Sequence, residues 1–367
     1  MKGEAFNKWW LLPLGIVAAS ALLASGILAF EPSFVERSFA AITQRAPSGA
    51  VVDCSGALSS DYACYQQRYQ DLVRDFGVGA AFTDLKEQNE NNEFVKANCH
   101  QMTHVIGRAA FDLYGDLSTT YGQGDAFCEG GYYHGAIEVV AAKVGPDKIR
   151  EKANTLCADL SENQKYSSYH YNCVHGLGHG FMGILDNEVF KSLETCDTLT
   201  DDWEKQSCYG GVFMENVGAE NNPSRPSKYL KADRPLYPCT DVEARYKDPC
   251  YQIQTTYALR TQGNDFAKVF NLCAKSEDDS PQACYQGLGR DAAGQSLTDV
   301  AQTKSTCMLG EDYEARSNCI VGAARYLSYY YQNERQVKGF CESLDADLRA
   351  ACRQATEEYS RGLGSLI

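Results

Sequence analysis

The chain has one long apolar run near its N-terminus, followed by shorter apolar patterns with helical spacing. Residues 9–30 read WWLLPLGIVAASALLASGILAF and carry no charge over 22 positions. A helix of about 20 apolar residues spans the roughly 30 Å hydrocarbon core of a membrane. Lys2 and Lys8 precede the run, which favours a cytoplasmic N-terminus. We therefore predict a cytoplasmic segment at 1–8 and a transmembrane signal-anchor at 9–30.

The same run has a second interpretation, as a cleaved signal peptide. Its length exceeds the usual apolar region of about 7–15 residues in signal peptides, which favours an uncleaved anchor, whereas the small residues at 24–26 favour cleavage. Under both interpretations the chain after Glu31 lies on the extracytoplasmic side of the cell membrane. Residues 31–53, which include the segment APSG, are predicted to be a linker.

The C-terminal half shows a helical pattern that repeats. Residues 265–276, DFAKVFNLCAKS, place apolar side chains at helical spacing. A polar turn follows, and then Ser280 and Pro281 form the expected start of a second helix, ACYQGLGRDAAG. Leading cysteines recur every 34 residues from Cys239 to Cys341, a period typical of helical-hairpin arrays. We predict an all-α solenoid of disulfide-stapled αα-hairpin repeats behind a single N-terminal transmembrane helix.

Cysteine spacing supports disulfides. The chain has 16 cysteines, and none lies in a CxxC or CxxCH arrangement. Close pairs in an exported chain are typical of disulfides, and closing a loop of about a dozen residues contributes roughly 3 kcal/mol. The predicted pairs are Cys54–Cys64, Cys157–Cys173, Cys196–Cys208, Cys239–Cys250, Cys273–Cys284, Cys307–Cys319 and Cys341–Cys352, with Cys99–Cys128 assigned by elimination.

From Cys157 to Cys352, in segments such as ACYQGLGRDAAG, the chain resembles the cysteine-rich Sel1-like and TPR-like αα-hairpin repeat proteins. That resemblance implies the fold and carries no function. The chain departs from the family in the wider spacing of its paired cysteines. The resemblance does not account for the histidines, and no family is assigned to the histidine-containing region. We divide the exported part into a histidine-rich helical part at 54–195, repeats at 196–360 and a tail at 361–367.

Two columns recur after the second cysteine of five of the pairs. The third position is glycine, which we expect to let the two helices of a hairpin approach closely; its members are Gly131, Gly176, Gly211, Gly287 and Gly322. We expect the sixth position to face the concave or inner surface; its members are His134, His179, Met214, Arg290 and Arg325.

All six histidines lie between residues 100 and 179. Two pairs have i,i+4 spacing, which places both imidazoles on one helix face, as in the HxxxH core of zinc enzymes. We predict a metal centre with the ligands His100, His104, His134, His175 and His179. Further ligands or neighbours are predicted to be His170 at the rim, Glu138, Glu215, Tyr133 and Tyr171. The alternative is a set of hydrogen-bonded structural histidines.

The glycines next to two of these histidines allow two interpretations. Gly135 and Gly180 follow His134 and His179 directly. They leave room for a ligand or substrate, or they serve helix packing. The step from Cys157 to Cys173 is also longer than in the other short pairs, as expected for a binding loop.

Imidazole ligands suit copper, iron and zinc, which the sequence does not distinguish. The missing CxxCH excludes c-type haem, whereas a bis-histidine b-type haem stays open. The net charge of −14 argues against a nucleic-acid partner. We expect a membrane-anchored metalloenzyme with redox chemistry at copper or iron, or hydrolytic chemistry at zinc. The alternatives are a non-catalytic metal- or haem-binding protein and a scaffold that binds a protein partner on its concave face.

Overall fold

The computed structural model describes residues 51–158, 160, 165–219, 227–276, 281–296, 299–331 and 334–360. The predicted cytoplasmic segment, the signal-anchor at 9–30, the tail at 361–367 and most of the linker lie outside these residues. Within the described ranges, no helix combines the length and the apolar character needed to cross a membrane.

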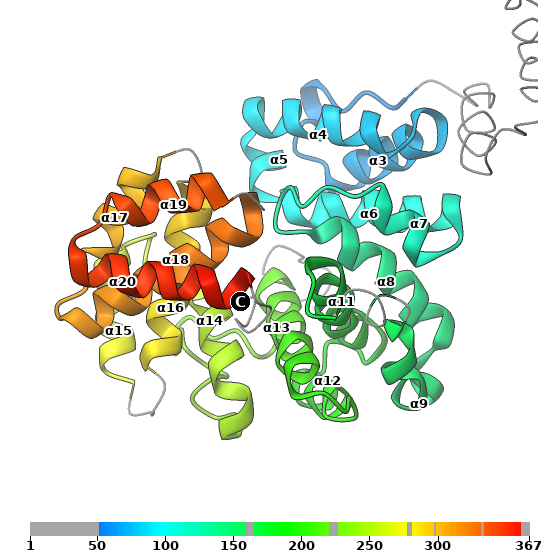
Figure 1. Cartoon of the computed structure of the whole chain (residues 1–367). Helices are drawn as coiled ribbons and strands as arrows, with labels where there is room; N and C mark the ends of the chain where they lie inside the picture. Colours follow the sequence, from blue (N-terminus) through cyan, green and yellow to red (C-terminus); the bar gives the residue numbers. More distant parts are fainter. Residues whose placement is uncertain are drawn as a thin grey trace, which may run out of the picture. The chain divides into compact units, whose positions relative to one another are not determined.

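All regular structure in the described residues is helical, so the all-α prediction is confirmed. Nine helices form a row in which each one packs against the next (Figure 1). This central row contains α3 (Tyr62–Phe76), α6 (Cys99–Tyr114), α8 (Gly131–Val144), α11 (Ser168–Ile184), α13 (Asp202–Gly218), α14 (Ala244–Thr261), α16 (Pro281–Gln295), α18 (Tyr313–Tyr331) and α20 (Ala346–Ser360).

Of the other described helices, η1 (Gly56–Leu58) precedes α3, and the rest lie between successive members of the central row. They are α4 (Val78–Asn91), α5 (Glu93–Ala97), α7 (Leu117–Gly122), α9 (Pro146–Leu156), α12 (Val189–Cys196), α15 (Phe266–Ala274), α17 (Val300–Cys307) and α19 (Glu334–Glu342). The row continues across residue 195, and the chain from Ala50 onward clusters as one unit.

Local sequence signals set several helix starts. The side chain of Asp61 accepts hydrogen bonds from the amides of Ala63 and Cys64 at the start of α3. Ser167 caps α11 by accepting from the amide of His170. Such side-chain acceptors satisfy amides that have no partner within the helix. Pro281 is the first residue of α16, as predicted, while Ser280 lies outside the described residues.

The recurring glycines bring neighbouring members of the central row into close contact. A Cβ atom on Gly211 of α13 would lie 1.9 Å from the carbonyl oxygen of His175 on α11. On Gly322 of α18 it would lie 1.9 Å from the carbonyl oxygen of Gln286 on α16. The expectation that these glycines face the other helix of the same hairpin is therefore wrong. They face the preceding helix of the central row, because the long helices make the tighter contacts.

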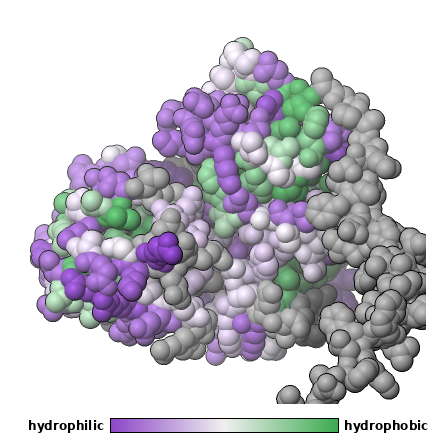
Figure 2. Space-filling model, turned by 45° about the horizontal axis from the view of Figure 1, so that its top comes forward, coloured by the Kyte–Doolittle hydropathy of each residue, from purple (hydrophilic) through white to green (hydrophobic). Residues whose placement is uncertain are grey.

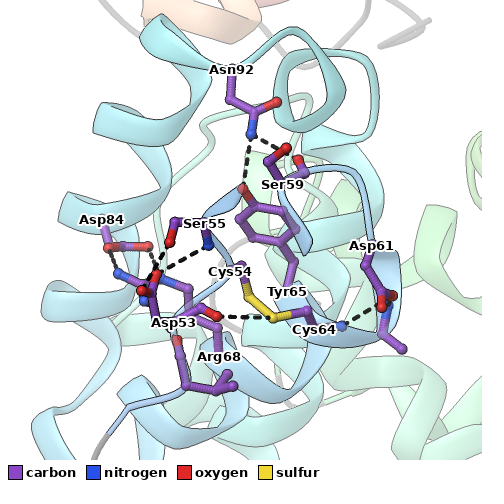
Figure 3. Close-up of a disulfide and its surroundings, with 12 residues drawn as sticks. Asp53, Cys54, Ser55, Ser59, Asp61, Cys64, Tyr65, Arg68, Asp84 and Asn92 are labelled. Atoms are coloured by element: carbon purple, nitrogen blue, oxygen red, sulfur yellow. Dashed lines mark hydrogen bonds and ion pairs between the residues drawn. A yellow bond between two sulfur atoms is a disulfide. The ribbon is translucent and has the colours of Figure 1, made fainter. Parts of the chain in front are cut away.

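All 16 cysteines form disulfides in the pairs that their spacing predicted, Cys99–Cys128 included. Most of the staples join the end of a short helix to the first turns of the next helix in the row. Figure 3 shows the first staple, Cys54–Cys64. Nearby, Arg68 donates to the carbonyl of Val52 and to the carboxylate of Asp84. The last residues of the predicted linker are therefore fastened to α3.

The central row curves back on itself. The hydroxyl of Tyr329 on α18 donates to Asn172 on α11 at 2.9 Å, and the hydroxyl of Tyr326 lies 3.5 Å from Glu129, just before α8. Within the predicted concave column, the side chains of His134, His179 and Arg290 are buried. The inner surface is thus filled largely by the chain itself. The face shown in Figure 2 is mostly hydrophilic, with smaller hydrophobic areas.

Candidate metal centre

Three consecutive helices of the central row carry the histidines: α6, α8 and α11. Close helix contacts bring their side chains together. A Cβ atom on Gly107 would lie 1.9 Å from the carbonyl oxygen of Tyr132, and one on Gly135 would lie 2.1 Å from that of His104. A Cβ on Gly180 would meet Ala141 at 2.8 Å. Gly135 and Gly180 therefore serve helix packing, and the ligand space proposed beside them is filled by neighbouring helices.

Four imidazoles meet at one point. His100, His104, His134 and His179 each offer a ring nitrogen, and these nitrogens lie within 4.8 Å of one another. The Nε2 atoms of His100 and His104 are 3.0 Å apart. Two ligands of one tetrahedral ion, with bonds of 2.0–2.1 Å, would be roughly 3.3 Å apart. The group is therefore close to the dimensions of a single coordination shell.

In two of these rings, the outer nitrogen, which points away from the common point, is hydrogen-bonded to a carboxylate. Nδ1 of His104 donates to Glu138 at 2.7 Å, and Nδ1 of His179 donates to Glu215 at 2.8 Å. Arg108 binds the second oxygen of Glu138 at 2.7 Å. Such bonds place the proton on Nδ1 and leave the Nε2 lone pair for a metal. Glu138 and Glu215 thus act as partners of the ligands, one of the two roles predicted for them.

Neutral oxygens hold the outer nitrogens of the other two rings. Nδ1 of His100 donates to the carbonyl of Cys128 at 2.9 Å. Nε2 of His134 donates to the side-chain oxygen of Asn172 at 3.2 Å, and the hydroxyl of Tyr329 donates to the same oxygen. His100 therefore offers Nε2 to the centre, whereas His134 offers Nδ1.

The four ring nitrogens that face the common point of the cluster have no hydrogen-bond donor opposite them. Nδ1 of His134 and Nε2 of His179 are buried and have no partner among the described residues. Leaving a buried polar atom unpaired costs about 1–3 kcal/mol. The lone pairs of His100 and His104 face each other. One metal ion at the common point would bind all four nitrogens.

The electrostatics of the site favour the metal-binding forms of these side chains. Burial, reinforced by the neighbouring imidazoles, lowers the pKa of His100 and of His134. Metal ligation requires neutral imidazole. Burial alone would raise the pKa of Glu138, but His104 and Arg108 outweigh it and lower that pKa below its usual value. Glu138 is therefore ionised and strengthens the basicity of His104.

The structure separates the two remaining predicted histidines from this group. His175 lies beside it, with its ring 4.8 Å from that of His134, and its Nδ1 bonds to the hydroxyl of Tyr171 at 3.0 Å. His170 bonds to Glu204 at 2.9 Å and packs against Trp203. The geometry thus assembles four of the five predicted ligands, and His170 belongs to a separate buried pair.

The predicted tyrosines also have different surroundings. Tyr133 packs against Tyr121 and Tyr169, with ring centroids 5.0 Å and 5.7 Å away, in an aromatic part of the core. Tyr171 lies nearer the centre, through its bond to His175.

A small cavity of about 10 Å³ lies beside the centre. Its lining residues come from both halves of the chain and are Glu129, His134, Tyr171, His175, Met214, Arg290, Tyr326 and Tyr329. The sequence did not indicate that Asn172, Glu129, Tyr326 and Tyr329 lie at this site. Arg290 was named only as a member of the sixth-position column. Neither the repeat period nor a motif marks the residues that meet when α18 returns to α11.

No protein-family model, curated protein or solved structure matches this chain. The resemblance to Sel1-like and TPR-like repeat proteins therefore stays a prediction.

Proposed function

We propose that this protein is a metalloprotein in which His100, His104, His134 and His179 bind one transition-metal ion. One observation carries the proposal: four ring nitrogens lie within 4.8 Å of one another, and the opposite nitrogen of every ring is hydrogen-bonded to an acceptor. Structural histidines would use their hydrogen-bonding nitrogens on separate partners, as His170 does with Glu204.

A second grouping of possible ligands shares one residue with the first. Glu138, His179 and Glu215 offer atoms within 4.8 Å of one another. Their carboxylates already accept hydrogen bonds from His104 and His179. A metal there would displace those bonds, so we assign the ion to the four-histidine group.

Four imidazoles suit zinc, copper or iron. A b-type haem is less well supported, because its two axial imidazoles would lie on opposite faces of a flat ring, whereas these four rings surround one point. An enzyme needs a position for an added ligand at or beside its metal, and the cavity lined by His134 and His175 provides nearby space. We therefore favour a metal-dependent oxidoreductase or hydrolase over a non-catalytic metal-binding protein.

We further propose that the folded domain is extracytoplasmic, behind an anchor at residues 9–30. Eight disulfides suit an oxidising compartment. The row of helices and its period of 34 residues in the C-terminal half support the αα-hairpin solenoid interpretation. A protein partner on the concave face is the weaker alternative, since His134, His179 and Arg290 in that column are buried.

Elemental analysis of the full chain, purified in detergent from an oxidising compartment, tests the metal centre. We expect close to one metal ion per chain. His104→Ala and His179→Ala should lose it. His170→Ala is the matched control, because His170 is equally buried and also pairs with a glutamate. Equal metal content in all three variants would overturn the assignment.

A further inference from the structure

A chain of aromatic rings runs outward from the four-histidine centre. The ring centroid of His175 lies 4.8 Å from that of His134 and 5.2 Å from that of His179. The ring centroid of Tyr171 lies 5.1 Å from that of His175, and the ring centroid of Trp203 lies 6.3 Å from that of Tyr171. Each ring in this chain therefore packs against the next.

The two ends of this chain differ in their access to solvent. His175 is 0% exposed and Tyr171 is 4% exposed. Trp203 is half-buried and follows Asp202, whose side chain is 93% exposed. A large molecule outside the protein can therefore approach Trp203 but cannot reach the buried histidines. Electrons exchanged between such a molecule and the ion need groups that lie between them.

Tyr171 has a proton acceptor at its hydroxyl. The hydroxyl oxygen lies 3.0 Å from Nδ1 of His175. The ring of His175 also interacts with the backbone of Ser207, which suits a proton on Nε2 and leaves Nδ1 as the acceptor. A phenol that has lost one electron is a strong acid, so its proton passes to Nδ1 although burial lowers the pKa of His175. This transfer makes Tyr171 easier to oxidise than a tyrosine without such a base.

Trp203 lacks a proton acceptor of this kind. Its Nε1 atom is buried and has no hydrogen-bond partner among the described residues. An oxidised Trp203 therefore keeps its N–H proton and stays a radical cation, which is a stronger oxidant than the neutral radical. It takes an electron readily from Tyr171, whose own proton can leave. The side chain that is easier to oxidise thus lies nearer the ion.

We propose that Trp203 and Tyr171 carry single electrons from a redox-active ion at the four-histidine centre to a one-electron acceptor at the surface beside Trp203. The acceptor takes one electron from Trp203, which takes one from Tyr171 while the hydroxyl proton of Tyr171 moves to Nδ1 of His175. One electron from the ion then restores Tyr171, and the proton returns. The ion is oxidised by one electron, the acceptor is reduced by one electron, and no proton is released.

This path rests on the proposed metal centre and narrows the identity of the ion. Zinc has no redox chemistry, so the path has a use only with copper or iron, which imidazole ligands also suit. The path favours an oxidoreductase over a hydrolase. Its electron acceptor is a separate molecule that stays outside the protein.

A photochemical oxidant attached next to Trp203 tests the path. The native histidines are buried or half-buried, so Asp202→His provides one exposed imidazole for a ruthenium polypyridyl complex. The full chain with this change is loaded with copper, reduced to Cu⁺ and illuminated with a reversible soluble quencher, which generates Ru³⁺. The yield of Cu²⁺ per flash, measured by EPR, reports how well electron transfer along the path competes with recombination.

We expect Tyr171→Phe and Trp203→Phe to lose most of the Cu²⁺ yield at equal copper content, because phenylalanine is much harder to oxidise. Tyr133→Phe is the matched control and should keep the yield, since Tyr133 is also buried but packs against other tyrosines. Zinc-loaded protein should instead hold the oxidation on Tyr171, with a tyrosyl EPR signal that Tyr171→Phe removes.

Either path variant that keeps the Cu²⁺ yield of the Tyr133 variant would overturn the path and leave the metal centre standing. A copper-loaded Asp202→His protein that forms no Cu²⁺ after Ru³⁺ is generated would do the same. Protein that takes up zinc but neither copper nor iron would also overturn the path alone. Protein that takes up no metal would overturn the metal centre and the path together.

Discussion

Tyr329 donates a 2.9 Å hydrogen bond to the side-chain oxygen of Asn172, which lies 157 positions earlier in the chain. The same oxygen accepts the Nε2 hydrogen of His134. This bond fixes the imidazole so that Nδ1 faces the other three histidines. A helix from the C-terminal half therefore takes part in setting the orientation of His134, a proposed metal ligand in the N-terminal half of the described residues.

Asn172→Ala should weaken metal binding by about 10- to 100-fold, the usual loss when a ligand's hydrogen-bonded partner is removed. Titration of the metal-free protein with Zn²⁺ measures the change. Asn318→Ala is a matched control, because Asn318 also bonds to the carbonyl four residues before it and accepts from a neighbouring helix. Equal affinities in the two variants would show that Asn172 does not orient His134.

Glu138→Gln should also weaken metal binding by about 10- to 100-fold, because a neutral amide supports the basicity of His104 less well than a carboxylate. Glu204→Gln removes the same charge from the His170 pair and should leave metal affinity unchanged. Zn²⁺ titration of both variants checks this. A loss of affinity in the Glu204 variant alone would place the metal at His170.

The metal-free protein should lose stability as the pH falls below about 6.5. Burial lowers the pKa of His100, His134 and His175 in the folded protein, whereas unfolded histidines titrate near 6.5. Below that pH the unfolded chain binds more protons, so the free energy of unfolding falls, by up to about 1.4 kcal/mol per pH unit for each histidine.

Urea unfolding of the metal-free protein between about pH 5.5 and 7.5 measures this slope. His175→Gln removes one of the three groups and should make the slope shallower. A free energy of unfolding that stays constant or increases as the pH falls through this range would contradict the pKa assignment.

Removing the Cys99–Cys128 disulfide should weaken metal binding more than removing Cys341–Cys352. Both changes remove a loop closure, which stabilises a fold by about 2–4 kcal/mol. Only the first also frees the carbonyl of Cys128, which accepts from His100. Paired Cys→Ser variants, compared by Zn²⁺ titration and by thermal unfolding, separate the two effects. Metal affinities that fall equally would show that the staple acts through general stability alone.

Much of the fold follows from local pattern. The cysteine period predicted helical hairpins and their staples because each unit repeats the same short-range spacing. The pattern did not predict which helix packs against the recurring glycines, because a small residue permits close approach without specifying which helix approaches. Gly211 meets the preceding long helix at His175.

The candidate site was predictable only in part, for a similar reason. The i,i+4 spacing indicated that His100 and His104 share a face, and they do meet. His170 and His175 lie on the same helix as His179, yet they point to different partners, which depends on helix rotation within the row. The contact of Tyr329 with Asn172 requires the curvature of the whole row, which no local pattern specifies.

Anomalous X-ray diffraction at the absorption edge of the bound metal tests the central claim most directly. We predict one strong peak about 2.0–2.1 Å from Nε2 of His104, Nε2 of His179 and Nδ1 of His134, with His100 completing the shell. A crystal of protein with near-stoichiometric metal that shows its peak elsewhere, or bound through Nε2 of His134, would contradict the account.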